Sequence, residues 1–178
     1  KNREGDYQLL EQEATKYGFR VKEIPEKILQ DITISSTRIR EALLSGNIDT
    51  ANEFLGYQYF FTGLVVEGNK LGRTIGYPTA NLEIKDNEKL VPGNGVYAVD
   101  VEVENFAGRF KGMMNIGTRP TVDGSKRVIE VNIFEFDNEI YGSNVKVYLK
   151  RRLRGEVKFN GINELKQQLG KDKLNAAF

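Results

Sequence analysis

The hydrophobic pattern changes at Tyr57, and this change constrains the fold more than any other feature of the sequence. Before Tyr57 apolar residues recur with the period of a helix, and after it they recur at every second position, as in strands. In segment 97–103, for example, a tyrosine and three valines alternate with smaller or charged residues. The other predicted strands are 59–67, 109–116, 128–136 and 145–153. Five or six short strands at this spacing predict a small antiparallel barrel.

The first 56 residues predict three helices and one short extended run at 19–24. The expected caps and closing glycines are Asp6 with Gly18, Ser36 with Gly46, and Asp49 with Gly56. Because this part has few large apolar residues, we expect it to be the end of a larger domain. At the other end of the chain, Asn160 is expected to cap a helix that covers or plugs the barrel.

Composition excludes several kinds of chemistry. The 178 residues contain no cysteine and no histidine, so thiolate catalysis, disulfides and the commonest zinc sites are excluded. A net charge of +1 gives no overall field that would attract a nucleic acid or a membrane, and we expect neither as a partner. Any general base is therefore Asp, Glu, Lys or Tyr, and we expect a cytoplasmic protein.

The segment 68–81 combines three glycines, two cations and a Pro-Thr-Ala-Asn sequence. Glycines allow backbone amides to approach an anion, and Lys70 and Arg73 add positive charge. Thr79 and Asn81 are two apart in an extended segment, so their oxygens point to the same side and suit Mg²⁺. A Walker P-loop is excluded because Asn69 precedes the lysine and Leu71 follows it. The spacing alone fits a phosphate site and a plain glycine-rich hairpin about equally well.

Glu130 interrupts an apolar strand, on the same face as Asn132. A partly buried carboxylate there is a candidate proton acceptor, although a structural glutamate paired with a basic residue is the commoner case. The Pro-stiffened loop 115–121 is either a ligand flap or a plain hairpin connection, and the basic run that contains Arg154 is either a phosphate clamp or solvated charge.

Taken together, these segments resemble the prokaryotic bifunctional riboflavin kinase/FAD synthetase family. The matching motifs lie at Gly68 to Asn81, Gly95 to Tyr97, Asn115 to Thr121, the Glu130 strand with Tyr141 and Gly142, and Leu153 to Phe159. The resemblance implies a six-stranded antiparallel Greek-key barrel with a C-terminal helix. It also implies transfer of the γ-phosphate of ATP to riboflavin, with Mg²⁺ as cofactor and FMN and ADP as products.

The resemblance assigns roles to individual residues. Glu130 is expected to be the general base, and Thr79 and Asn81 are expected to bind Mg²⁺ and nucleotide. The residues expected to bind ATP or flavin are Gly68, Lys70, Gly72, Arg73, Gly76, Pro78, Thr79, Asn81, Asn115, Arg119 and Arg154.

Residues 1–56 resemble the end of the family's FMN adenylyltransferase domain, a Rossmann-like α/β nucleotidyltransferase, and residues 57–178 resemble its riboflavin kinase domain. The matching ATP-phosphate motif contains Ser35, Ser36, Thr37 and Arg40. Its partner motif in the family contains histidines, which this chain lacks. We therefore expect the intact parent protein to make FMN and FAD, and this chain alone not to make FAD.

Two positions depart from the family pattern. Asn132 stands where the family usually has histidine, and Tyr57 where it usually has arginine. The first departure lies beside the expected base and can alter turnover. Alternatives to the kinase are a barrel that binds flavin or nucleotide without catalysis, and a barrel that contacts RNA. The sequence leaves the oligomeric state open.

Overall fold

The computed structural model describes residues 7–21, 28–29, 32–68, 71–121 and 124–177. They form two compact units, Lys1–Ile34 and Ser35–Phe178. In the first unit, helix α1 (Tyr7–Tyr17) ends at Gly18, and strands β1 (Ile28–Leu29) and β2 (Ile32–Thr33) form an antiparallel pair. All of the candidate site lies in the second unit.

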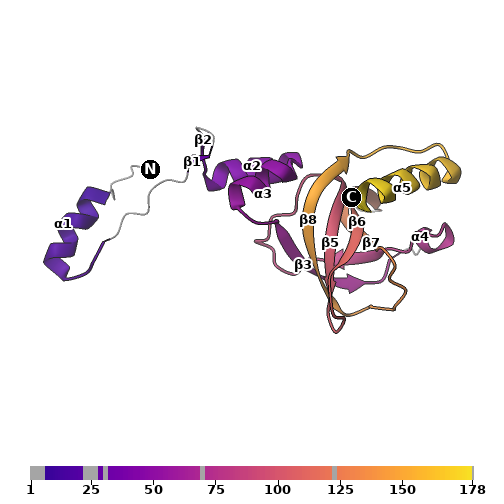
Figure 1. Ribbon diagram of the computed structural model, residues 1–178, viewed down its shortest axis with the longest axis horizontal. Helices are drawn as coiled ribbons and strands as arrows, with labels where there is room; N and C mark the ends of the chain where they lie inside the picture. Colours follow the sequence, from indigo (N-terminus) through magenta and orange to yellow (C-terminus); the bar gives the residue numbers. More distant parts are fainter. Residues whose placement is uncertain (1–6, 22–27, 30–31, 69–70, 122–123, 178) are drawn as a thin grey trace. The chain divides into compact units, whose positions relative to one another are not determined.

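The second unit is built on a closed barrel of six antiparallel strands (Figure 1). The strands are β3 (Phe60–Val66), β4 (Ala80–Glu83), β5 (Gly95–Val103), β6 (Phe110–Thr121), β7 (Gly124–Ile133) and β8 (Asn144–Arg154). Their order around the barrel is β3-β4-β7-β6-β5-β8. Strands β5, β6 and β7 follow one another as hairpins, and β8 returns to lie beside β5, which is the Greek-key arrangement. The predicted barrel is confirmed.

Alternate residues of the strands enter two different apolar clusters. Ile129 and Val131 of β7, with Val99, Val101 and Leu149, belong to the main core inside the barrel. On the opposite face, Met113 and Ala98 pack with residues of the C-terminal helix α5 (Ile162–Ala177). The alternating pattern of β7 therefore places Glu130 and its neighbours on the outer face of the barrel.

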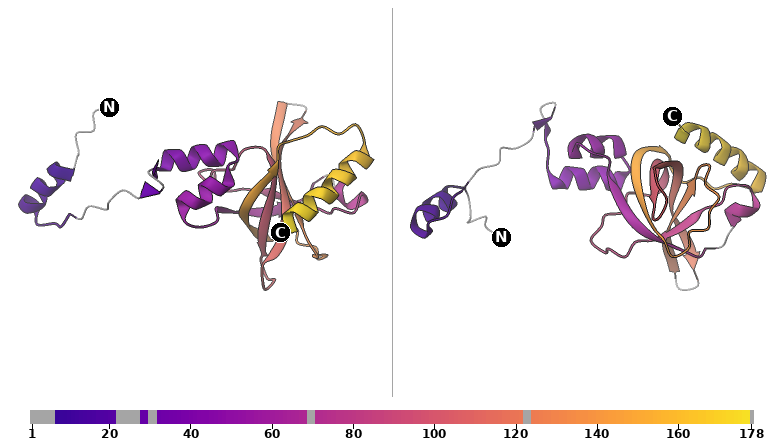
Figure 2. Two further views of the ribbon diagram at one scale, coloured as in Figure 1. Left: turned by 45° about the horizontal axis from the view of Figure 1, so that its top comes forward. Right: turned by 60° about the horizontal axis from the view of Figure 1, so that its bottom comes forward.

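Helix α5 lies along this outer face, in contact with β5, β6 and β8 (Figure 2). Its buried Ala176 packs against the sheet, and Lys111 and Arg151 donate hydrogen bonds to carbonyls in its last turn. Cations at this end are favourable because the helix dipole is negative there. The predicted helix covers the side of the barrel and does not plug its end.

Helices α2 (Ser36–Ser45) and α3 (Ile48–Leu55) pack on the barrel core through Leu43, Ile48 and Ala51. Each ends at a glycine with positive φ, Gly46 and Gly56, as predicted. The expected N-caps are wrong by one or two residues. Ser35 caps α2 in place of Ser36, and Asn47 caps α3 in place of Asp49, because these side chains reach the free amides of the first turn.

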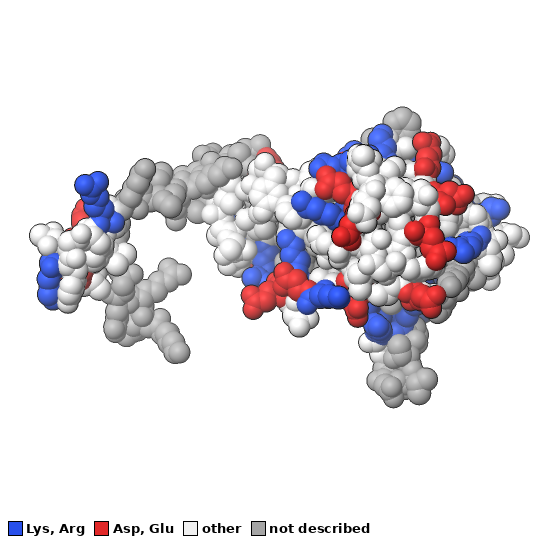
Figure 3. Space-filling view, turned by 90° about the horizontal axis from the view of Figure 1, so that it is seen from below, with Lys and Arg blue, Asp and Glu red and all other residues white. Residues whose placement is uncertain are grey.

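Charge is mixed on the one face of the barrel unit that Figure 3 draws. On the face shown in Figure 3, basic and acidic side chains of the barrel unit are interspersed, so no field of one sign covers this face. Among the described helices, none has the length and apolar character needed to cross a membrane.

Candidate functional site

The candidate site is built on one row of residues that runs across adjacent strands. Asn81 of β4 lies opposite Glu130 of β7, and Glu130 lies opposite Asn115 of β6. The row continues through Val96 of β5 to Arg154 of β8. Residues directly opposite one another in an antiparallel sheet point to the same face, so this register brings together side chains from five strands.

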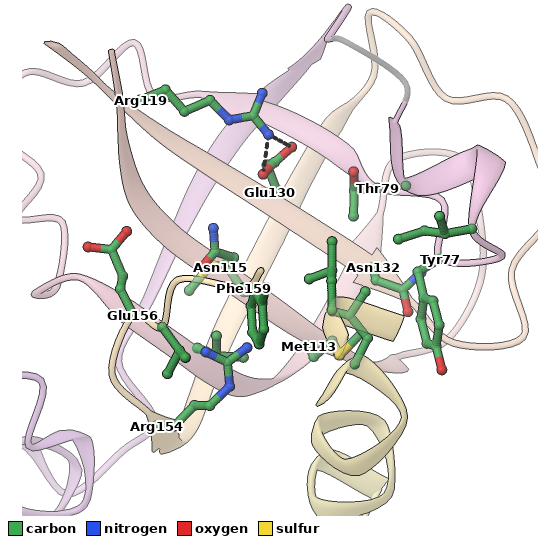
Figure 4. Close-up of a pocket in the computed structure, with 17 residues that line it drawn as sticks. Tyr77, Thr79, Met113, Asn115, Arg119, Glu130, Asn132, Arg154, Glu156 and Phe159 are labelled. Carbon is green, nitrogen blue, oxygen red and sulfur yellow. Dashed lines mark hydrogen bonds and ion pairs between the residues drawn. The ribbon is translucent and has the colours of Figure 1, made fainter. Parts of the chain in front are cut away.

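A cavity of about 250 Å³ lies over this row, between the outer face of the barrel, α5 and segment 155–161 (Figure 4). Its polar lining includes Thr79, Asn115, Glu130, Asn132 and Arg154. The apolar lining residues are Ile75, Val96, Met113, Met114, Val157, Phe159, Leu165 and Leu169. A largely apolar cavity with a few converging polar groups is the usual form of a small-molecule site.

Glu130 is held by Arg119 within this cavity. One terminal nitrogen of Arg119 donates to both carboxylate oxygens of Glu130, each at 2.8 Å, and Figure 4 shows the contact. The glutamate side chain is 16% exposed and the arginine side chain 40% exposed. The ion pair thus joins a mostly buried carboxylate to a more exposed cation.

The turn that carries Thr79 depends on Gly72. Helix α4 (Leu71–Thr74) is followed by a turn in which the Tyr77 amide donates to the Gly72 carbonyl at 2.8 Å. A Cβ atom at Gly72 would lie 2.2 Å from the Tyr77 carbonyl oxygen, so only glycine allows this approach. Gly76 has a φ of 85°, in the left-handed region. The two glycines thus fix the direction in which the chain enters β4.

Asn81 packs against Gly68 at the start of this loop. A Cβ at Gly68 would lie 2.1 Å from the Asn81 side-chain nitrogen, so the amide occupies the space that a side chain would fill. A second, smaller cavity of about 70 Å³ lies next to this turn, and its lining includes Arg73, Pro78, Thr79, Glu139 and Tyr141. Thr79 lines both cavities.

Asn132 is buried, with 6% of its surface exposed, and its side-chain nitrogen donates to the Pro78 carbonyl at 2.6 Å. This contact ties β7 to the residue directly before Thr79. Asn132 therefore supports the turn, from a position two residues along β7 from Glu130.

Arg154 forms an ion pair beneath the cavity. Its guanidinium makes hydrogen bonds of 2.7–3.1 Å to Asp172 of α5, which is 1% exposed and also accepts from Gln168. The guanidinium lies 5.7 Å from the Phe159 ring centre. A buried carboxylate that is paired in this way holds Arg154 in one orientation and fastens α5 to β8.

The structure gathers most of the predicted site residues. Gly72, Thr79, Asn115, Arg119, Glu130 and Arg154 line the larger cavity, and Arg73, Pro78 and Thr79 line the smaller one. Asn81, Gly68 and Gly76 lie in the adjoining loop and strand. Lys70 lies outside the described residues. Ser35, Ser36, Thr37 and Arg40 lie at the start of α2 and line neither cavity.

Some cavity residues were not predicted. Tyr77, Met113 and Glu156 line the larger cavity, and Asn94 supports its wall. Tyr77 belongs to the Gly68–Asn81 motif, which was a usable signal. Met113 lies in the predicted strand 109–116 and Glu156 in the Leu153–Phe159 motif, but neither residue was singled out. Their place in the cavity depends on how α5 and segment 155–161 fold over the barrel.

The donor set around Thr79 suits a magnesium ion that shares its ligands with phosphates. Within the described residues, no group of three or more Asp, Glu, His or Cys side chains could hold a metal ion by itself. The oxygens of Thr79 and Asn81 are neutral, and Mg²⁺ in nucleotide sites takes much of its coordination from phosphates and water. These residues therefore fit Mg²⁺ bound together with a nucleotide.

The chain matches a protein-family model and several curated proteins. Residues 55–177 match the flavokinase family, described as riboflavin kinase. The bifunctional riboflavin kinase/FMN adenylyltransferase of Bacillus subtilis is 47% identical over 150 residues, which cover 83% of this chain and 46% of that protein. The enzyme of the same name from Haemophilus influenzae is 40% identical, over 96% of this chain and 54% of that protein. The chain thus spans about half the length of these curated relatives.

Two solved structures are also similar. A Streptococcus pneumoniae protein described as a macrolide-efflux protein has a TM-score of 0.84 and 40% identity, over 94% of this chain and 54% of that one. Riboflavin kinase from Trypanosoma brucei has a TM-score of 0.50 and 20% identity, over 68% of this chain and 77% of that one, and supports the barrel fold. From the family match and the identity to its bacterial relatives, the chain belongs to the riboflavin kinase family.

Proposed function

We propose that the barrel transfers the γ-phosphate of ATP to the 5′-hydroxyl of riboflavin and so makes FMN and ADP. The observation that carries this proposal is that Thr79 and Glu130 line one cavity, with Asn81 directly opposite Glu130 in the β4–β7 pair. Phosphoryl transfer to a hydroxyl needs both kinds of group in one site: a group that binds the phosphate donor and a group that accepts the proton.

The larger cavity suits the flavin, because its apolar walls include Met113 and Phe159. Arg73 borders the smaller cavity together with Glu139 and mostly apolar residues, and is a candidate to meet a phosphate of the nucleotide. Because Thr79 lines both cavities, it marks the place where donor and acceptor would meet.

In the reaction the riboflavin hydroxyl oxygen forms a bond to the γ-phosphorus, and the bond between that phosphorus and the ADP oxygen breaks. The hydroxyl proton passes to the Glu130 carboxylate, which the ion pair with Arg119 keeps in place. Arg119 also adds positive charge beside the transferring group, whose charge must be neutralised. Asn115, which lies opposite Glu130, is a candidate to orient the hydroxyl.

Thr79 and Asn81 are the residues that would hold Mg²⁺ together with the ATP phosphates. When bound, the ion neutralises phosphate charge and so lowers the barrier to attack by the hydroxyl. We further propose that Gly68, Lys70, Gly72, Gly76 and Pro78 shape the phosphate-binding loop, and that Arg154 borders the flavin.

For the parent protein we propose two activities, in line with the names of its relatives. Residues 57–178 would form the riboflavin kinase domain, and residues 1–56 would be part of an FMN adenylyltransferase domain. Ser35, Ser36, Thr37 and Arg40 would belong to the ATP site of that second domain, at the start of α2. Use of ATP by both activities fits a cytoplasmic enzyme.

The direct test is to incubate the chain with riboflavin, ATP and Mg²⁺ and to follow FMN by chromatography. Formation of FMN and ADP in equal amounts supports the kinase, and FAD is not expected from this chain alone. A second candidate is a barrel that binds flavin without catalysis. One observation favours it: Arg119 occupies both oxygens of Glu130, as in a purely structural pair. Binding of riboflavin with no FMN formed would support that second candidate.

A further inference from the structure

Asn94 is bonded to four other parts of the barrel unit. Its side-chain nitrogen donates to Glu156 at 2.9 Å and to the Thr118 hydroxyl at 3.0 Å. Its side-chain oxygen accepts from Arg127 at 3.0 Å, and its backbone carbonyl accepts from Arg152 at 2.7 Å. Because a carboxylate faces one end of the amide and a guanidinium faces the other, the side chain has one favourable orientation.

The backbone around Asn94 is fixed as well. The Gly93 amide donates to the Leu43 carbonyl at 2.9 Å, and the hydroxyl of the fully buried Tyr97 donates to the Gly93 carbonyl. Burial raises the pKa of Tyr97, so this hydroxyl remains a donor at physiological pH. Asn94 is therefore a rigid anchor at the start of β5.

Glu156 lies in the connection between β8 and α5, outside the sheet. Besides the bond from Asn94, its other oxygen accepts from the Thr118 amide at 3.4 Å. A Cβ at Gly117 would lie 2.5 Å from that oxygen, so the carboxylate rests in a space that glycine leaves open on β6. The side chain is thus held by Asn94 on one side and by the β6 backbone on the other.

The connection that Glu156 belongs to forms a wall of the larger cavity. Within segment 155–161, the residues Glu156, Val157 and Phe159 line the cavity, and Figure 4 shows Glu156 and Phe159 beside Asn115. Most of the segment is exposed. A surface connection of this kind needs a specific tie if it is to hold an apolar wall in place.

We propose that Asn94 and Glu156 are positioning residues that hold segment 155–161 against β6 and so fix the flavin-facing wall of the cavity. This proposal rests on the proposed function for the identity of the ligand. Asn94 lines neither cavity, and Glu156 lines the larger cavity but not the smaller one that Arg73 borders. The pair is therefore expected to act on the binding of riboflavin and to leave kcat and the binding of ATP nearly unchanged.

The kinetic test uses Asn94→Ala, Glu156→Ala and the double variant. Each single variant is expected to raise the KM for riboflavin about tenfold, the scale of a lost charge-assisted hydrogen bond, with kcat and the KM for ATP changed less than about twofold. Because the two residues share the Asn94–Glu156 hydrogen bond, the effect of the double variant is expected to be smaller than the product of the two single effects. Additive effects, or an unchanged KM for riboflavin, would overturn the proposal.

The matched control is Glu104→Ala. Glu104 follows the other end of β5 and accepts hydrogen bonds from the backbone and side chain of Asn144, at 2.8 and 3.0 Å. It resembles Glu156 in being an exposed, hydrogen-bonded glutamate, but it lines neither cavity. Its loss is expected to leave all kinetic constants at the wild-type level, and thermal unfolding of every variant shows that each remains folded.

A second measurement needs no activity. Lys158 is an exposed trypsin site inside segment 155–161. Cleavage after Lys158 is expected to be several times faster in Asn94→Ala and Glu156→Ala than in the wild type or in Glu104→Ala, because release of the segment exposes its backbone. Equal cleavage rates in all four proteins would show that the Asn94–Glu156 hydrogen bond does not hold segment 155–161 in place. If the wild type forms no FMN, the proposed function fails, while the cleavage rates still decide whether the tie exists.

Discussion

One nitrogen of Arg119 bridges both oxygens of Glu130, at 2.8 Å to each. The two residues are eleven positions apart, and the β6–β7 hairpin brings them together. The contact joins Glu130, which is proposed to accept the proton, to Arg119, whose side chain is 40% exposed. In the proposed reaction Arg119 would support the base and meet the incoming phosphate.

Arg119→Ala is expected to lower kcat by roughly 10²-fold, because it removes a charge that stabilises the transferring phosphoryl group. Arg119→Lys is expected to recover part of this loss, since a single nitrogen makes both contacts and a lysine supplies one. Steady-state FMN formation measures both. Arg109→Ala is the control, because Arg109 pairs with Glu102 at 2.7 Å and lines neither cavity. Equal losses in Arg119→Ala and Arg109→Ala would argue against a role at the site.

Thr79→Val is expected to raise the Mg²⁺ concentration for half-maximal activity roughly tenfold or more, since it removes one oxygen and keeps the side-chain shape. A titration of FMN formation with MgCl₂ at saturating ATP measures this. Thr62→Val, at an exposed position of β3, makes the same chemical change away from the cavities and is expected to change nothing. An unaltered Mg²⁺ requirement in Thr79→Val would remove Thr79 from the metal site.

Gly72→Ala is expected to lower kcat/KM on the order of 10²-fold. The new Cβ would lie 2.2 Å from the Tyr77 carbonyl oxygen, so the turn must open and Thr79 must shift, and small displacements of reacting groups are costly. Gly161→Ala is the matched control, because a Cβ there meets no atom within 4 Å. The two variants are compared by FMN formation and by thermal unfolding. Wild-type activity in Gly72→Ala would show that the turn tolerates the change.

Acid stability is expected to depend on Glu102. Hydrogen bonds from Arg109 and then from Tyr148 hold the pKa of Glu102 below its ordinary value of 4.5. A depressed pKa means that this group stabilises the fold fully above about pH 4.5 and that the contribution is lost as pH falls through the lower, folded value. The Tm of Glu102→Gln is therefore expected to fall less steeply than that of the wild type below pH 4.5.

Thermal unfolding between pH 3 and pH 7 checks the expectation for Glu102. Glu53→Gln, an exposed position on α3, serves as the control and is expected to follow the wild-type curve. Parallel curves for the wild type and Glu102→Gln would contradict the assignment.

The barrel could be predicted from the sequence because strands such as 97–103 alternate and the turns are rich in Gly, Asn and Asp. Strand β4 was not among the predicted strands, since four residues after a proline carry too little pattern. The packing of Leu43 and Ile48 into the barrel core also escaped prediction, because an apolar helix face does not reveal what covers it.

The site was predictable where a motif carried it and not where it depended on the packing of distant segments. The motif at 68–81 and the strand of Glu130 indicated the main residues. The partner of Arg154 was not indicated, because Asp172 lies between two lysines in a polar stretch that gives no sign of burial, and yet it is 1% exposed. Asn94 and Glu156 are likewise joined only by the closure of the barrel.

The most direct test of the central proposal is the turnover of Glu130→Gln with riboflavin, ATP and Mg²⁺. The amide keeps the size of the side chain but cannot accept the hydroxyl proton, so kcat is expected to fall roughly 10²-fold or more while the KM values change little. A kcat close to that of the wild type would contradict the role of Glu130 as the base.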